Sequence, residues 1–130
     1  MKLFIIILAL ILFLPIAQAV QAETSIDTIN QKVLQRFDGD INNLSAILEE
    51  LKTRQHVTKT VVAYGRGETP LDSAAYYLNF AAEASAYQKV QTYSSNQTGR
   101  SQLKSDLITL ASKILRAKSE IKQALIFYEK

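Results

Sequence analysis

The segment from Thr69 to Tyr93 constrains the fold most, because as a helix it is apolar on two sides. One side of the helical wheel carries small and aliphatic residues, and nearly the opposite side carries aromatic residues. A narrow polar strip of Asp72, Asn79 and Glu83 lies between them. A helix of this kind needs a neighbour on each flank. The small-residue side holds Leu71, Ala75, Leu78 and Ala82, and the aromatic side holds Tyr76, Phe80 and Tyr87.

Two long amphipathic segments, one before and one after this stretch, supply the neighbours. Their apolar residues recur at steps of three and four, which is the period of an α-helix. We therefore predict an all-α fold, an elongated antiparallel three-helix bundle with helices near residues 25–54, 70–93 and 99–129, running up, down and up. The first series is Ile26, Ile29, Val33, Phe37, Ile41, Leu44, Leu48 and Leu51, and the second is Leu103, Leu107, Leu110, Ile114, Ala117, Ile121, Leu125 and Tyr128, thickened by Ile108, Ala111 and Leu115.

The predicted helix boundaries follow from capping residues and turn formers. Thr69 and Pro70 mark a sharp start for the middle helix, and the polar run 94–99 predicts a short turn after it. Gly39 lies inside the first helix and favours a bend there. Residues 55–68 are rich in β-branched residues and contain two glycines, so they predict a connector. This connector either closes one end of the bundle or has a role of its own.

The first 22 residues have the pattern of an export signal. Lys2 precedes an apolar run from Leu3 to Leu14, and small-x-small cleavage sites end at Ala19 and Ala22. As a helix, residues 3–17 would reach about 22 Å, short of the roughly 30 Å of a bilayer core. The sequence predicts a signal peptide over residues 1–22, with an uncleaved membrane anchor as the alternative. Residues 23–130 then form one exported domain in the periplasm, the cell envelope or the extracellular space.

Composition narrows the classes of function. The formal net charge of +3 does not favour a nucleic-acid partner, which selects for clustered excess positive charge. The chain contains no cysteine, which excludes disulfides and thiolate metal sites. His56 is the single histidine, so a multi-histidine metal centre is excluded as well. We expect no cofactor, and membrane contact only through the N-terminal segment if it is retained.

One stretch is similar in spacing to a calcium-binding loop. Asp38, Asp40, Asn42 and Glu49 fall at loop positions 1, 3, 5 and 12. The usual glycine at position 6 is replaced by Asn43. The spacing of apolar residues by three and four positions also continues through the supposed loop, as a continuous helix requires. We therefore predict no metal site and keep calcium binding through these four residues as a weak alternative.

The aromatic side of the middle helix is the second candidate site. Tyr76, Phe80 and Tyr87 either pack in the core or present a face to a partner or ligand. No serine–histidine pair, glycine-rich phosphate loop or paired carboxylates occur at a spacing that suits catalysis, so we expect no enzyme. The middle helix is also the shortest, and the apolar ends of its neighbours are therefore expected to be partly uncovered.

Three functions remain open at this point. The first is an exported, non-catalytic interaction or structural protein, which associates with a protein partner or with itself through helical surfaces. The second is a carrier of a small apolar ligand in the bundle interior or on the Tyr76, Phe80 and Tyr87 face. The third and weakest is a calcium-responsive protein through the stretch 38–49.

Overall fold

A computed structural model describes residues 25–57 and 69–129, and this part of the chain is all-helical, with three helices and no strand. The helices are α2 (Ile26–Arg54), α3 (Pro70–Lys89) and α4 (Gln97–Tyr128). The predicted all-α class and the three helices are confirmed. The predicted signal segment, with its cleavage sites, and most of the predicted connector lie outside the described residues.

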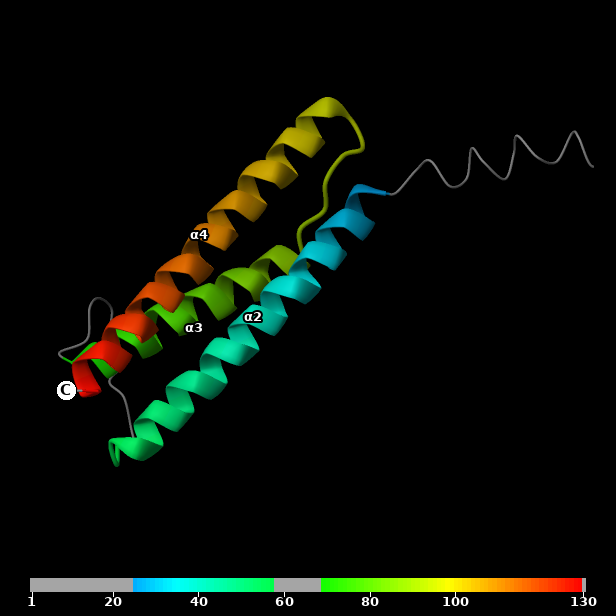
Figure 1. The fold of residues 1–130 in the computed structure, drawn as a ribbon. Coiled ribbons are helices and arrows are strands. Elements are labelled where there is room, and N and C mark those ends of the chain that lie inside the picture. Colours follow the sequence, from blue (N-terminus) through cyan, green and yellow to red (C-terminus); the bar gives the residue numbers. More distant parts are fainter. Residues whose placement is uncertain (1–24, 58–68, 130) are drawn as a thin grey trace, which may run out of the picture.

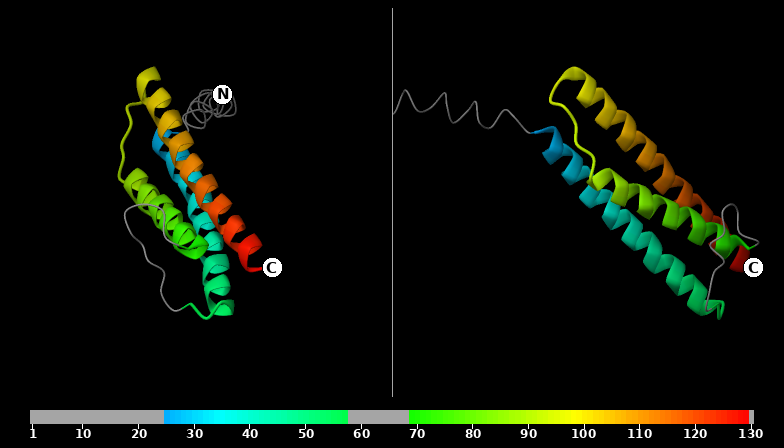
Figure 2. Two further views of the ribbon diagram at one scale, coloured as in Figure 1. Left: turned by 90° about the vertical axis from the view of Figure 1, so that its left-hand side faces the viewer. Right: turned by 180° about the vertical axis from the view of Figure 1, so that it is seen from behind.

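The three helices pack side by side into an elongated bundle (Figures 1 and 2). α3 runs antiparallel to both α2 and α4, so that α2 and α4 run in the same direction. Each helix contacts the other two. α3 is the shortest helix, with 20 residues against 29 in α2 and 32 in α4. Both longer helices therefore extend past it at one end or the other.

The core is built from the stripes that the sequence predicts. Alanines are prominent in this core, and Ala81 of α3 and Ala117 of α4 are both fully buried. Small side chains at such positions let two helices approach closely. Leu71 and Ile121 are the largest hydrophobic side chains with almost no exposed surface. Other members of the core cluster are Leu34, Ile41, Leu44, Leu48, Leu51, Ala74, Ala75, Leu78, Leu110, Ile114 and Ala124.

Side-chain caps fix where the helices begin. The Thr69 hydroxyl accepts a hydrogen bond from the Asp72 N–H at 3.1 Å, and the Asp72 carboxylate accepts one from the Thr69 N–H at 3.2 Å. This reciprocal capping box satisfies two N–H groups that have no partner inside the helix. Ser25 caps α2 through the Thr28 N–H, and Asn96 caps α4 through the Gly99 N–H.

The C-terminus of α2 closes in a left-handed turn at His56, which has a φ of 54°. The Val57 N–H donates to the Lys52 carbonyl, and the His56 N–H donates to the Thr53 carbonyl. This is the pair of bonds that defines a Schellman motif, although its left-handed position more often holds glycine. Val57 packs against the core. The start of the predicted connector thus helps to close this end of α2.

Two predicted boundaries differ from the structure. α3 ends at Lys89 instead of residue 93, and α4 begins at Gln97 instead of residue 99. The early end of α3 coincides with the side-chain hydrogen bonds of Tyr93, which lie outside the helix. The early start of α4 follows from the Asn96 cap. α2 continues through Gly39 as one helix.

Candidate functional site

An apolar groove lies between the N-terminal halves of α2 and α4 and has a volume of about 720 Å³. Its walls contain large aliphatic and aromatic side chains that the bundle covers only in part. Ile29 is 43% exposed and Ile108 is 56% exposed. The lining residues are Ile26, Ile29, Val33 and Phe37 from α2, and Arg100, Leu103, Lys104, Leu107, Ile108 and Ala111 from α4.

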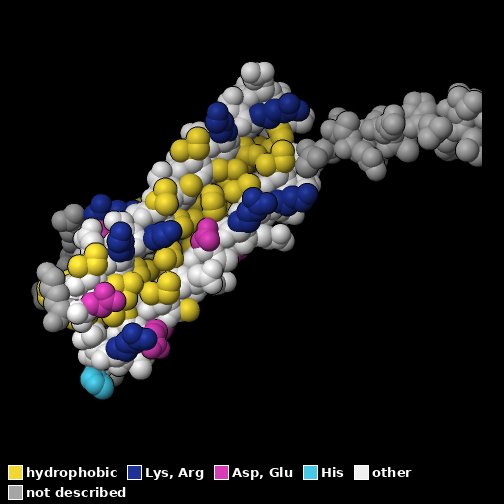
Figure 3. Space-filling view, in the orientation of Figure 1, with side chains coloured by type: hydrophobic (Ala, Val, Ile, Leu, Met, Phe, Trp, Pro, Cys, Tyr) yellow, Lys and Arg dark blue, Asp and Glu magenta, His cyan; other side chains and the backbone are white. Residues whose placement is uncertain are grey.

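The groove is open because a third helix covers the α2–α4 pair from one side only. α3 packs against both helices from behind in the view of Figure 1. In Figure 3 a strip of hydrophobic side chains runs between α4 and α2 on the face that α3 does not cover. α3 stops at Lys89, and the chain then continues without helix to α4. Apolar side chains of α2 and α4 are therefore partly uncovered on this face of the bundle.

A chain of polar side chains joins α2, α3 and α4 near this end of the bundle. The buried Gln88 amide nitrogen donates to the Asn30 amide oxygen at 3.1 Å and to the Tyr93 hydroxyl oxygen at 2.6 Å. The Tyr93 hydroxyl donates in turn to the Asp106 carboxylate at 2.7 Å. Buried polar groups with complete hydrogen bonding specify one arrangement of their neighbours. This network therefore fixes how α2 and α4 are spaced at the groove.

The same contacts change how Tyr93 titrates. Burial and the adjacent Asp106 carboxylate raise the pKa of the Tyr93 phenol above its ordinary value of 10.0. Both causes disfavour the phenolate, because a negative charge would be poorly solvated and would face another negative charge. The phenol therefore stays protonated and continues to donate its hydrogen bond over the neutral range.

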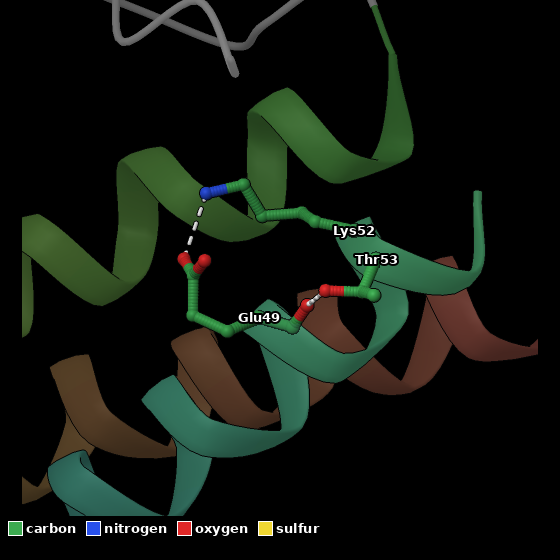
Figure 4. Close-up of polar contacts among 3 residues, drawn as sticks. All are labelled: Glu49, Lys52 and Thr53. Carbon is green, nitrogen blue, oxygen red and sulfur yellow. Dashed lines mark hydrogen bonds and ion pairs between the residues drawn. The ribbon is translucent and has the colours of Figure 1, made fainter. Parts of the chain in front are cut away.

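The four residues of the calcium-like pattern lie along one continuous helix, and Asp38 and Glu49 are held in other interactions. Asp38 accepts a hydrogen bond from Ser85 at 2.8 Å and pairs with Lys89 at 2.7 Å, both on α3. Burial raises the pKa of Asp38, but these two contacts outweigh it, so that the pKa lies below the ordinary value. Glu49 pairs with Lys52 at 2.7 Å, as Figure 4 shows.

No loop forms between Asp38 and Glu49, because α2 is helical throughout this stretch. Asp40 and Asn42 are exposed on α2. Within the described residues, no group of three or more histidine, cysteine, aspartate or glutamate side chains is placed to hold a metal ion.

The predicted aromatic face is brought together only in part. The rings of Tyr76 and Phe80 stack with centroids 6.3 Å apart and an interplanar angle of 7°. Lys113 of α4 lies over the Phe80 ring at 4.3 Å from its centroid. Tyr87 is 68% exposed and lines a different hollow, together with residues such as Gln91 and Asp106. Tyr76 and Phe80 thus contribute to the α3–α4 boundary, and the three residues form no single pocket.

Sequence reasoning did not identify the groove as a site, although its apolar residues were all in the predicted apolar series. Ile108, Ala111 and Leu115 were interpreted as a thickening of the core stripe. In the structure Ile108 and Leu115 are 56% and 64% exposed. The sequence did contain a signal for this site, namely a second apolar stripe with cationic residues on the same face of the helix. Lys104 precedes Ala111 by seven residues and therefore lies on the same face.

Comparison of this chain with family models, curated proteins and solved structures gives no match. None of the three described helices carries an apolar stretch long enough to span a bilayer. The site is therefore interpreted from its own residues.

Proposed function

We propose that this chain is an exported, non-catalytic interaction protein that binds a helical segment of a protein partner in the α2–α4 groove. The observation that carries the proposal is the groove itself, about 720 Å³ in volume and lined mainly by aliphatic and aromatic side chains. Proteins recognise amphipathic helices by placing the apolar side of the helix in such a groove. A helix there would complete a four-helix arrangement and cover the exposed side chains of both walls.

Two features of the groove favour a helix over a small ligand. The groove lies between two parallel helices, so an elongated occupant fits along its length. Its walls are also half-exposed, as the values for Ile29 and Ile108 show. A small ligand in a protein pocket is usually enclosed on most of its surface, whereas a bound helix keeps a solvated outer side. An open groove therefore suits a helix better than a small ligand.

A carrier of a small apolar ligand is the second candidate function. The groove volume lies within the range of roughly 300–1,000 Å³ that is typical of ligand pockets. Native mass spectrometry of the protein from its own cells separates the two candidates. A retained small molecule supports the carrier, and a retained protein chain supports the interaction protein.

Site-specific cross-linking in the cells that make the protein tests the proposal. A photoreactive amino acid replaces Ile108 in the groove wall, and a matched variant carries it at Asn42, an exposed position on the opposite side of α2. We expect the Ile108 variant to form an adduct that maps to an amphipathic helix of a defined partner. The Asn42 variant is expected to give none. Equal adducts at both positions, or no protein adduct at Ile108, would contradict the proposal.

A further inference from the structure

The charges around the groove restrict the partner further, and this step rests on the function proposed above. Arg100 and Lys104 of α4 line the groove. Lys118 follows Ala111 by seven residues, and Lys122 follows Leu115 by seven, so each cation lies on the groove-facing side of α4. The four cationic residues Arg100, Lys104, Lys118 and Lys122 are here called the basic rim, and all four are exposed.

The basic rim is not neutralised within the described residues. The ion pairs there join Lys52 to Glu49, Arg54 to Glu50, Lys89 to Asp38 and Arg116 to Glu120, and none includes a rim residue. The two acidic residues of this part of α4 have other partners. Asp106 accepts the Tyr93 hydrogen bond, and Glu120 is buried against Arg116 at 2.6 Å.

The opposite wall does not cancel this charge. Arg36 follows Ile29 by seven residues and Asp40 follows Val33 by seven, so both lie on the groove side of α2. Their charges offset each other. In Figure 3 dark-blue side chains lie along the edges of the apolar strip. The groove thus combines an apolar floor with a net positive border.

We infer that the occupant is an acidic amphipathic helix: a helix with one leucine-rich side and glutamate or aspartate along its flanks. The apolar side would cover the groove floor, and the flanking carboxylates would face the basic rim. Along α4 the groove lining runs from Arg100 to Ala111, about 17 Å at 1.5 Å per residue, and the basic rim continues to Lys122, about 33 Å from Arg100. The matching helix therefore has between three and six turns. Complementary charge of this kind mainly sets specificity and the rate of association.

Two other occupants fit the same observations less well. A second copy of this chain would bring its own basic rim to the interface, and like charges would face each other. An anionic membrane matches the charge but not the shape. Membrane-binding helices present a protruding apolar side that enters the headgroup layer, whereas these side chains line a hollow between two helices.

Peptide binding to the full chain tests the inference. The probe is a helical peptide of about 24 residues with leucine at heptad positions a and d and glutamate at e and g. Its twin carries lysine in place of every glutamate. Fluorescence anisotropy is expected to show that the acidic peptide binds roughly tenfold or more tightly than the basic twin. The preference is expected to shrink in 0.5 M salt, because salt screens exposed charges.

Two double variants with the same change in net charge locate the effect. K104Q/K118Q removes two charges from the basic rim, and N42E/T109E adds two negative charges at exposed positions away from the groove. We expect the first to reduce binding of the acidic peptide several-fold and the second to leave it nearly unchanged. Circular dichroism establishes that both variants are folded. An equal loss in both variants would overturn the inference.

The remaining outcomes separate this inference from the proposed function. Equal binding of both peptides at the groove would overturn the acidic partner and leave the helix-binding function intact. Binding of neither peptide would overturn both. Tighter binding to vesicles that contain phosphatidylserine than to the acidic peptide would overturn the inference in favour of a membrane. A dimer in sedimentation that Ile108→Glu in the groove wall separates into monomers would overturn it in favour of a second copy.

Discussion

The two sides of the α2–α4 pair differ in how they are covered. On the side of α3, the contact contains small residues such as Ala74, Ala81 and Ala124, all with no exposed surface. On the groove side, Ile29, Ile108 and Leu115 remain between 43% and 64% exposed. The α3 side of the pair therefore includes alanines with no exposed surface, whereas large apolar residues on the groove side stay about half exposed. This difference supports the proposal that the groove is a surface for binding, whereas the α3 side is part of the buried core.

The largest expected effect comes from one substitution made on each side of α4. Ile121→Ala removes a side chain that is 2% exposed, and we expect it to lower the free energy of unfolding by about 2–4 kcal/mol. Ile108→Ala removes the same atoms from a residue that is 56% exposed, and a loss below about 1 kcal/mol is expected. Urea denaturation measures both. Similar losses would show that the two sides are equally packed.

Larger side chains, in place of smaller ones, test the same difference in packing between the core and the groove. Ala81→Leu introduces three carbon atoms where no surface is exposed, and overpacking is expected to cost about 1–3 kcal/mol. Ala111→Leu places the same atoms in the groove wall, where space exists, and we expect little change in stability. Thermal denaturation distinguishes the two variants. A large loss for Ala111→Leu would mean that the groove is closed in solution.

The polar network gives a smaller effect with a pH dependence. Tyr93→Phe removes the hydrogen bonds to Asp106 and Gln88 and is expected to cost about 1–2 kcal/mol at pH 7. The pKa of the Tyr93 phenol is raised in the folded state, so its contribution is present below the ordinary pKa of 10 and is lost as pH rises through the higher folded pKa.

Urea denaturation of both proteins between pH 7 and 11 measures this effect of Tyr93. The difference in stability between the wild type and Tyr93→Phe is expected to shrink above pH 10. A constant difference across this range would contradict the role given to the Tyr93–Asp106 hydrogen bond. Phe80→Leu is the control, because Phe80 has no titrating hydroxyl.

The smallest expected effect is a gain in stability. A Cβ added at Gly39 would meet no atom within 4 Å, and the position is inside α2. Gly39→Ala is therefore expected to raise the free energy of unfolding by about 0.5–1 kcal/mol, the difference in helix propensity. Differential scanning calorimetry measures the gain. A loss would show that α2 uses Gly39 to bend, as the sequence suggested.

The helices were predictable because local rules specify them. The step of three and four residues defined α2 and α4, and the Thr69–Pro70 start of α3 was read from the capping pattern. The end of α3 was placed too late, at the last residue before the polar run 94–99. The Tyr93 hydroxyl is instead bonded to Gln88 and Asp106, and the second of these lies 13 positions away.

The site was less predictable, because it depends on how helices meet. The sequence predicted that a short middle helix leaves apolar ends uncovered, but not that Ile29 and Ile108 would line one groove. The pairing of Asn30 with Gln88 spans 58 positions. Local spacing contains no information about such a pair. Fold class therefore follows from periodicity, whereas the groove required the relative placement of α2 and α4.

Methyl-resolved NMR of the full chain with the acidic helical peptide tests the central claim most directly. If a helix docks between α2 and α4, the methyl signals of Ile29, Ile108 and Leu115 shift on titration, and those of Leu71 and Ile121 in the core stay in place. Shifts confined to residues beside Tyr76 and Phe80, or no shifts at all, would contradict the claim that the α2–α4 groove is the binding surface.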